Sequence, residues 1–375
     1  MSALSDPLAA VVIPPREGFG PDSAGALGLL AHHLAATPGF RTIVLGGPQS
    51  TPPFQDVEFH AARPAFWWLG NVNQRFAASV AVFLRRRRPA CIEVHNRPET
   101  AVSLARWLPS TPVSLHLNND PQVMRCAANP AERTALLARV ARVIVSSDYL
   151  RQRFLEGVEA DARRVVVLPN CIDISALPPA RTREKTILFA GRIVAEKAPD
   201  AFITACADAL PRLPGWSAEL IGADRFRNDS PETAFVASTR AAAQAAGVHY
   251  SGYRNHAAVL EAMARAAIVV VPSRWQEPFG LVALEALASG AVLICAPRGG
   301  LPEVAEDAAV YAEPNEPGAL SSAILRLASD PDRRAALAAA GRRRAQEFDV
   351  GVITARLAAL RHEVLSDPGI AAGHR

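Results

Sequence analysis

The sequence lacks long apolar segments and a framework of paired cysteines. None of its apolar runs approaches the roughly 20 residues that a membrane-spanning helix needs. Its start, MSALSDPLAAVVIPP, has no basic region followed by an apolar core and a cleavage site. The five cysteines are scattered and never form a Cys-x-x-Cys pair, which argues against a disulfide framework and against a zinc site. We therefore expect a cytoplasmic protein with reduced cysteines.

The sequence also lacks a strong excess of charge of one sign. It has 40 basic and 36 acidic residues, for a net charge of +4, and residues 1–177 hold the whole excess. This is too little for a general nucleic-acid binder, so no nucleic-acid partner is expected. Arg85–Arg88 concentrate the charge just before Pro89. They form either a solvated helix end or a contact with an anionic membrane surface.

Short β-branched runs alternate with longer helical patterns along the whole chain, which is typical of α/β domains with parallel sheets. The first half contains the runs Ala9–Ile13, Arg41–Leu45, Cys91–His95, Val113–Leu117, Val143–Ser146 and Val165–Leu168. The second half contains Ile187–Ala190, Ala218–Ile221, Val248–Ser251, Ile268–Val271, Val292–Cys295 and Ala309–Tyr311. Two doubly wound parallel-sheet domains follow from this rhythm.

Paired prolines and mixed charges in ISALPPARTREK interrupt both periodicities and predict an interdomain linker. We expect an N-terminal domain over residues 1–177 and a C-terminal domain over residues 178–349. A last helical pattern, Val350–Leu365, falls in the segment 350–375. From the sequence, this helix either covers the second domain or packs back on the first.

The string TILFAGRIVAEK places two cations beside the end of a predicted strand. Gly191 and Arg192 follow the strand, and Lys197 precedes the next helix. Cations at the positive end of a helix are unfavourable unless an anion such as a diphosphate compensates them. The alternative is that they pair with Glu196 or Asp200. Lys197 is also one of only two lysines in a chain that otherwise uses arginine.

A second string, VVVPSRWQEPFGLVALEALASG, runs from a predicted strand through a polar loop into a helix that begins around Pro278 or Gly280. Glu277 lies in the loop and Glu285 within the helix. Carboxylates accept hydrogen bonds from sugar hydroxyls, and the backbone N–H groups at the start of the helix suit an anion. The alternatives are a first-turn acid for Glu277 and a surface residue for Glu285.

Together, AGRIVAEK and EPFGLVALEALASG resemble the retaining glycosyltransferases of family 4, or glycosyl transferases group 1. PNCID and RGGLPEV extend the resemblance over most of the chain. It implies the GT-B fold, in which two Rossmann-like domains face a cleft. It also implies roles for the residues above. Arg192 and Lys197, beside Gly191, would bind the donor diphosphate, Glu277 the transferred sugar and Glu285 the ribose. Backbone contacts would come from Phe279, Gly280 and Leu281.

The resemblance implies further residues in the N-terminal half. Gly18 and Gly20 in REGFGPDSAGA are the candidates for the family's glycine-rich loop, although its usual adjacent glycines are absent. His116 in VSLHLNNDPQVM is the candidate for a histidine near the reacting sugar.

The histidine of the closest family pattern would stand where this chain has Asn118, directly before Asn119 and Asp120. Which of His116 and Asn118 faces the sugar stays open. His95 also ends a predicted strand, where it either faces the acceptor or caps the next helix.

The implied reaction transfers a hexosyl group from a nucleoside diphosphate sugar to a glycan acceptor and retains the anomeric configuration. His116, Glu277, Arg192 and Lys197 would form the catalytic set. UDP-sugars are favoured over GDP-mannose as donors. The acceptor would belong to lipopolysaccharide, exopolysaccharide or another envelope glycan, reached through peripheral contact of the N-terminal domain with an anionic membrane.

No cofactor or metal is expected, since cations can stabilise a departing diphosphate. Asp330–Pro331–Asp332 suggests a helix cap rather than a metal site. The run Phe66–Trp67–Trp68 could approach the membrane or belong to the core. A nucleotide-sugar epimerase and a noncatalytic nucleotide-binding module are the alternative functions.

Overall fold

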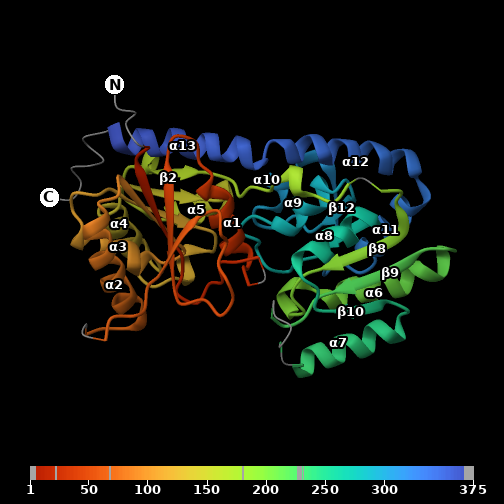
Figure 1. The fold of residues 1–375 in the computed structure, drawn as a ribbon. Coiled ribbons are helices and arrows are strands. Elements are labelled where there is room, and N and C mark those ends of the chain that lie inside the picture. Colours follow the sequence, from red (N-terminus) through yellow and green to blue (C-terminus); the bar gives the residue numbers. More distant parts are fainter. Residues whose placement is uncertain are drawn as a thin grey trace. The chain divides into compact units, whose positions relative to one another are not determined.

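The chain folds into two compact units in a computed structural model that describes residues 6–21, 23–66, 69–179, 181–225, 230 and 232–366 (Figure 1). One unit extends to Cys171 and resumes at Val350, and the other comprises Ile172–Asp349. This division lies a few residues before the boundary drawn from the sequence. It assigns the last helix to the first unit. Trp67 and Trp68 lie outside the described residues.

The first unit is built on a parallel sheet with seven strands among its described residues, in the order β3-β2-β1-β4-β5-β6-β7. The strands are β1 (Leu8–Val12), β2 (Arg41–Gly46), β3 (Glu58–Ala61), β4 (Cys91–His95), β5 (Val113–Leu117), β6 (Arg142–Val145) and β7 (Val165–Val167). The α-helices are α1 (Ala26–Ala35), α2 (Val72–Arg87), α3 (Pro98–Trp107), α4 (Pro130–Leu137), α5 (Asp148–Leu155) and α13 (Val350–Ser366). Only β3, a half-exposed edge strand, was not predicted from the sequence.

Alternating residues of these strands enter two different cores. Residues such as Val94 and Leu115 pack with α2, α3, α4 and α5. On the opposite face, Ile144 packs with Leu34 of α1 and Leu357 of α13. The sheet is therefore covered on both faces, which explains the nearly continuous apolar character of its central strands.

The second unit has six parallel strands among its described residues, in the order β10-β9-β8-β11-β12-β13. The strands are β8 (Glu184–Ala190), β9 (Ser217–Ile221), β10 (His249–Gly252), β11 (Ala266–Val271), β12 (Val292–Cys295) and β13 (Ala309–Tyr311). The α-helices are α6 (Pro199–Ala209), α7 (Ala234–Ala245), α8 (His256–Arg265), α9 (Leu281–Ala288), α10 (Leu301–Ala305), α11 (Ala319–Ser329) and α12 (Pro331–Gln346). Each of these six strands overlaps a predicted segment, but β8 begins at Glu184, within the string predicted to be a linker.

The chain reverses its direction of travel across the second sheet between β8 and β11. It winds outward from β8 to β10 and then resumes at β11 on the other side of β8. The carboxyl ends of β8 and β11 therefore form a topological switch point, where ligands bind in open α/β sheets. Both predicted donor strings follow these two strands.

Two smaller findings bear on the sequence predictions. Asp330 accepts a hydrogen bond from the Arg333 amide and caps α12, as expected. None of the described helices combines the length and the hydropathy that crossing a bilayer requires.

Candidate functional site

A lysine and a glutamate meet at the switch point of the second unit. Lys197 lies in the 3₁₀ turn Ala195–Lys197 after β8, and its Nζ is 2.5 Å from Oε1 of Glu277, in the loop after β11. Ser273 donates a hydrogen bond of 2.5 Å to the same oxygen. Glu277 is only 7% exposed. Lys197 therefore pairs across the switch point, and not with Glu196 or Asp200.

Gly191 and Arg192 follow the end of β8, a few residues before Lys197. Among the described residues, Arg192 forms an ion pair with Glu196, with 3.9 Å between the guanidinium and the carboxylate. The side chain of Arg192 is 40% exposed. A Cβ added to Gly191 would meet nothing nearer than the Phe189 ring at 3.7 Å. Packing within the unit therefore does not require a glycine there, and Arg192 remains an accessible cation.

The loop that carries Glu277 is held by close backbone contacts. The Gly300 amide donates to the Glu277 carbonyl at 2.7 Å. Gly280 has a φ of +109°, and a Cβ there would lie 2.5 Å from the Leu301 side chain. Glycine is therefore required before α9, which begins at Leu281. Phe279 is buried against Phe348, so its side chain belongs to the core.

Arg274 joins the two loops and was missed by sequence reasoning. Its guanidinium makes two hydrogen bonds of 2.7 Å to the Asp200 carboxylate and a third of 2.7 Å to Asn315. The amides of Arg274 and Trp275 both donate to the Glu196 carbonyl. This clamp holds the turn that ends in Lys197 against the loop that carries Glu277. The only available signal was an arginine closely following a buried strand.

Glu285 forms a separate pair with a histidine that the sequence did not single out. It lies in α9, and its Oε1 is 2.8 Å from Nε2 of His256, the first residue of α8. The hydrogen bond to Glu285 raises the pKa of His256 above its ordinary value, although burial acts in the opposite direction. The side chain of Glu285 is thus partly exposed, at 14%, and bonded to His256.

The glycines of the first unit have structural explanations. A Cβ at Gly18 would lie 2.0 Å from the Ser23 carbonyl oxygen, and a Cβ at Gly20 would lie 2.3 Å from that of Pro52. In the same loop, Glu17 accepts a hydrogen bond from the Gly28 amide in the first turn of α1. Burial raises the pKa of Glu17 despite that bond. The packing of this loop is therefore sufficient to require both glycines.

His95 and His116 form a buried stack on adjacent strands. They are register partners on β4 and β5, and their ring centroids are 4.5 Å apart. His95 is fully buried, and neither of its ring nitrogens has a hydrogen-bond partner among the described residues. Burial, with the neighbouring charge of His116, holds its pKa well below the ordinary value. His95 therefore does not cap α3, and its contact with an acceptor stays a prediction.

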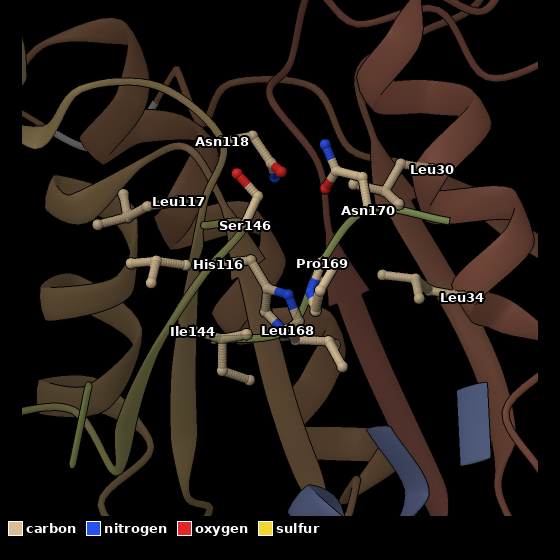
Figure 2. A pocket seen from close by; sticks show the side chains of 11 residues that line it. Leu30, Leu34, His116, Leu117, Asn118, Ile144, Ser146, Leu168, Pro169 and Asn170 are labelled. Atoms are coloured by element: carbon tan, nitrogen blue, oxygen red, sulfur yellow. The ribbon is translucent and has the colours of Figure 1, made fainter. Parts of the chain in front are cut away.

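His116 and Asn118 both line one small pocket within the first unit (Figure 2). The pocket has a volume of about 10 Å³, close to what one water molecule needs. Figure 2 shows the His116 ring deeper in the pocket than the side chains of Asn118, Ser146 and Asn170. The Asn118 amide donates to the Asn96 side chain at 2.7 Å. Since both candidates border the same space, the choice between them stays open.

The two residues after Asn118 differ from each other. Asn119 is exposed. Asp120 accepts a hydrogen bond from the Gln122 amide and lies 3.0 Å from the Arg153 guanidinium. Asp120 therefore has a structural role in holding the loop after β5. Within the described residues, no group of three or more His, Cys, Asp or Glu side chains is placed to hold a metal ion.

Solved structures of other proteins share this fold. HepE from Anabaena, solved in complex with UDP, superposes with a TM-score of 0.76 at 21% identity, over 94% of this chain and 99% of that chain. The two doubly wound parallel-sheet domains of this chain therefore have the GT-B fold. The sequence profile described as "Glycosyl transferases group 1" matches residues 173–344. The profile described as "Glycosyltransferase Family 4" matches residues 27–176.

The curated relatives agree with the profiles. The glycogen synthase of Mycobacterium tuberculosis is 31% identical over 403 residues, which cover 93% of this chain and 95% of that protein. The chain belongs to the family 4, group 1 glycosyltransferases, and it is an enzyme of glycosyl transfer. An exopolysaccharide phosphotransferase of Streptomyces coelicolor is 29% identical over 246 residues, but the chain spans only a quarter of that protein's length.

Proposed function

We propose that this glycosyltransferase moves a hexosyl group from a nucleoside diphosphate sugar to a glycan acceptor with retention of the anomeric configuration. The observation that carries the proposal is the ion pair between the half-buried Lys197 and the buried Glu277 at the switch point of the second unit. It places a cation for a phosphate beside a carboxylate for sugar hydroxyls. Arg192 and the amides at the start of α9 extend the anion-binding surface.

The proposed chemistry is the stabilisation of a departing diphosphate. As the bond to the sugar breaks, negative charge grows on the leaving oxygen, and Lys197 and Arg192 are preorganised to compensate it. Glu277 holds the sugar through its hydroxyls, and Ser273 fixes the orientation of that carboxylate. We propose that this reaction needs no metal. The acceptor-side candidates are His116 and Asn118, which border the pocket of the first unit.

We propose a UDP-sugar as the donor, with GDP-mannose as the second candidate. HepE has been solved in complex with UDP-glucose, and the Streptomyces relative is named for exopolysaccharide. We propose an acceptor among the envelope glycans, including lipopolysaccharide and exopolysaccharide.

We also propose that the first unit meets its acceptor at the cytoplasmic face of an anionic membrane. Phe66 and Leu69 are 89% and 95% exposed, and Arg85–Arg88 are exposed at the end of α2. Exposed aromatic and aliphatic side chains insert at the interface, while arginines attract anionic lipid.

The first test is thermal stabilisation by a panel of UDP- and GDP-sugars in the presence of EDTA, because a ligand that binds the native state raises Tm by mass action. We expect one nucleotide class to stabilise the protein. With the acceptor, NMR of the product should show the donor's anomeric configuration. A donor sugar that changes configuration at another carbon without any acceptor would reveal an epimerase. If none of the nucleotide sugars raises Tm, the proposed function is refuted.

Arg274→Ala should weaken donor binding more than it weakens the fold. The Arg274–Asp200 pair is half-exposed, so its loss should cost no more than about 1 kcal/mol of stability. Donor affinity should fall by about tenfold, since the turn carrying Lys197 loses its clamp. Donor titrations and melting curves of the variant measure both effects. Arg274→Lys keeps the charge without the paired bonds and should recover little affinity. Equal affinity in wild type and Arg274→Ala would contradict this role.

A further inference from the structure

A hydrogen-bonded histidine adjoins the carboxylate that we assign to the ribose. We propose that His256 is a positioning residue for the nucleotide. By binding Oε1 of Glu285, it fixes the carboxylate so that Oε2 accepts the ribose hydroxyls, and its charge makes nucleotide binding pH-dependent. This inference rests on the proposed function, because it assumes that Glu285 binds the ribose.

Among the described residues, Oε1 of Glu285 has a hydrogen-bond partner and Oε2 has none. The distance of 2.8 Å between His256 Nε2 and Glu285 Oε1 is typical of a charge-assisted hydrogen bond. The side chain of Glu285 is 14% exposed, whereas that of His256 is 45% exposed. Asn255 caps α8 by accepting from the Ala258 amide, so the backbone that carries His256 is fixed. A rigid histidine thus holds a largely covered carboxylate.

Among the described residues of the elements packed most closely against α8, Glu285 is the one charged side chain that pairs with His256. These elements are β8, β11 and α9. Glu285 is the sole ionisable residue of α9, and β11 has none. Glu184 and Lys185 lie at the start of β8, at the opposite edge of the sheet from the first residue of α8. On α8 itself, Arg265 pairs with Glu184 and Glu261 pairs with Arg181.

The protonated form of His256 should bind the nucleotide more tightly. The first turn of a helix disfavours a cation, so the raised pKa of His256 follows from its bond to Glu285. A nucleotide sugar brings further negative charge and should stabilise the same protonated state. By linkage, affinity is then greatest below the folded pKa and falls as the pH rises through it.

The test measures the affinity for UDP-glucose between pH 6 and pH 8.5. GDP-mannose replaces it if the GDP-sugars, and not the UDP-sugars, raise Tm in the thermal-stabilisation test. Neither diphosphate diester titrates in this range, so the protein causes any pH dependence. We expect wild-type affinity to fall by about three- to tenfold across the range. His256→Gln, which keeps a hydrogen-bond donor without the charge, should be nearly flat. His256→Ala should bind about fivefold more weakly than His256→Gln at pH 6. His249→Gln, at an exposed histidine, is the matched control and should follow wild type.

An NMR titration of His256 keeps the inference testable if a variant fails to fold. Saturation with the donor should raise its pKa, and an unchanged pKa would overturn the inference. Parallel pH profiles in wild type and His256→Gln would also overturn it. If no nucleotide sugar binds at any pH, the proposed function fails instead. The two failures are therefore distinguishable.

Discussion

Lys197→Ala should lower kcat/KM for the donor by at least about 100-fold, which is the typical cost of removing one preorganised donor to a developing charge. The variant also leaves Glu277, which is 7% exposed, with Ser273 as its remaining side-chain partner among the described residues. A buried carboxylate without its cation should reduce stability by about 1–3 kcal/mol. Steady-state kinetics and melting curves measure the two effects separately.

Two controls decide what Lys197 does. Lys185→Ala changes the chain's other lysine, which is exposed, and should retain wild-type kinetics. The second control places Lys197→Ala in a Glu277→Gln background. If Lys197 served only to neutralise Glu277, the double variant would be no less active than Glu277→Gln alone. We expect a further large loss, because we propose that the lysine also binds the diphosphate.

The sequence was most informative where a short segment contains both the end of a strand and the candidate site residues that follow it. All predicted strands of both sheets were found, and the donor strings follow β8 and β11 at a switch point. The pairing of Lys197 with Glu277 joins residues 80 positions apart. Local spacing offered only Glu196 and Asp200 as alternative partners, because a contact between distant segments is not visible in a sequence. The register of β8 against β11 decides the actual partner.

Residues whose roles depend on tertiary contacts were not predictable. Arg274 looked like any loop arginine, although it joins three segments. His256 had no motif around it, since its partner lies on the next helix. The strand β3 was missed because an edge strand with half-exposed residues has little hydrophobic signal. His95 was placed correctly at a strand end, but its stacking on His116 joins two strands and could not be read from local spacing.

Arg361→Met should be the most destabilising single change considered, with a loss of about 3–5 kcal/mol from the first unit. Arg361 of α13 makes two hydrogen bonds, of 2.9 and 2.8 Å, to the Glu93 carboxylate on β4, and both residues are 2% exposed. Removing the guanidinium would leave the buried Glu93 carboxylate without its ion-pair partner. It would also loosen α13, which packs on β6 and β7 through Ile353 and Leu357.

The double variant Glu93→Leu with Arg361→Met should recover most of that loss, because apolar residues of similar volume often replace a buried ion pair at little cost.

Acid unfolding gives an independent measure of the same ion pair. Burial alone would raise the pKa of Glu93, but Arg361 and His116 outweigh it and hold the pKa well below the ordinary value. The stability from this pair is therefore present above the unfolded pKa of about 4 and is lost as the pH falls through the folded pKa. Urea unfolding of the whole chain should show this acid-dependent loss of stability in the wild type, and the double variant should lack it. Arg163→Met removes an exposed ion pair and should leave the melts unchanged. If Arg361→Met melted like wild type at neutral pH, the ion pair would not be what holds α13 to the sheet.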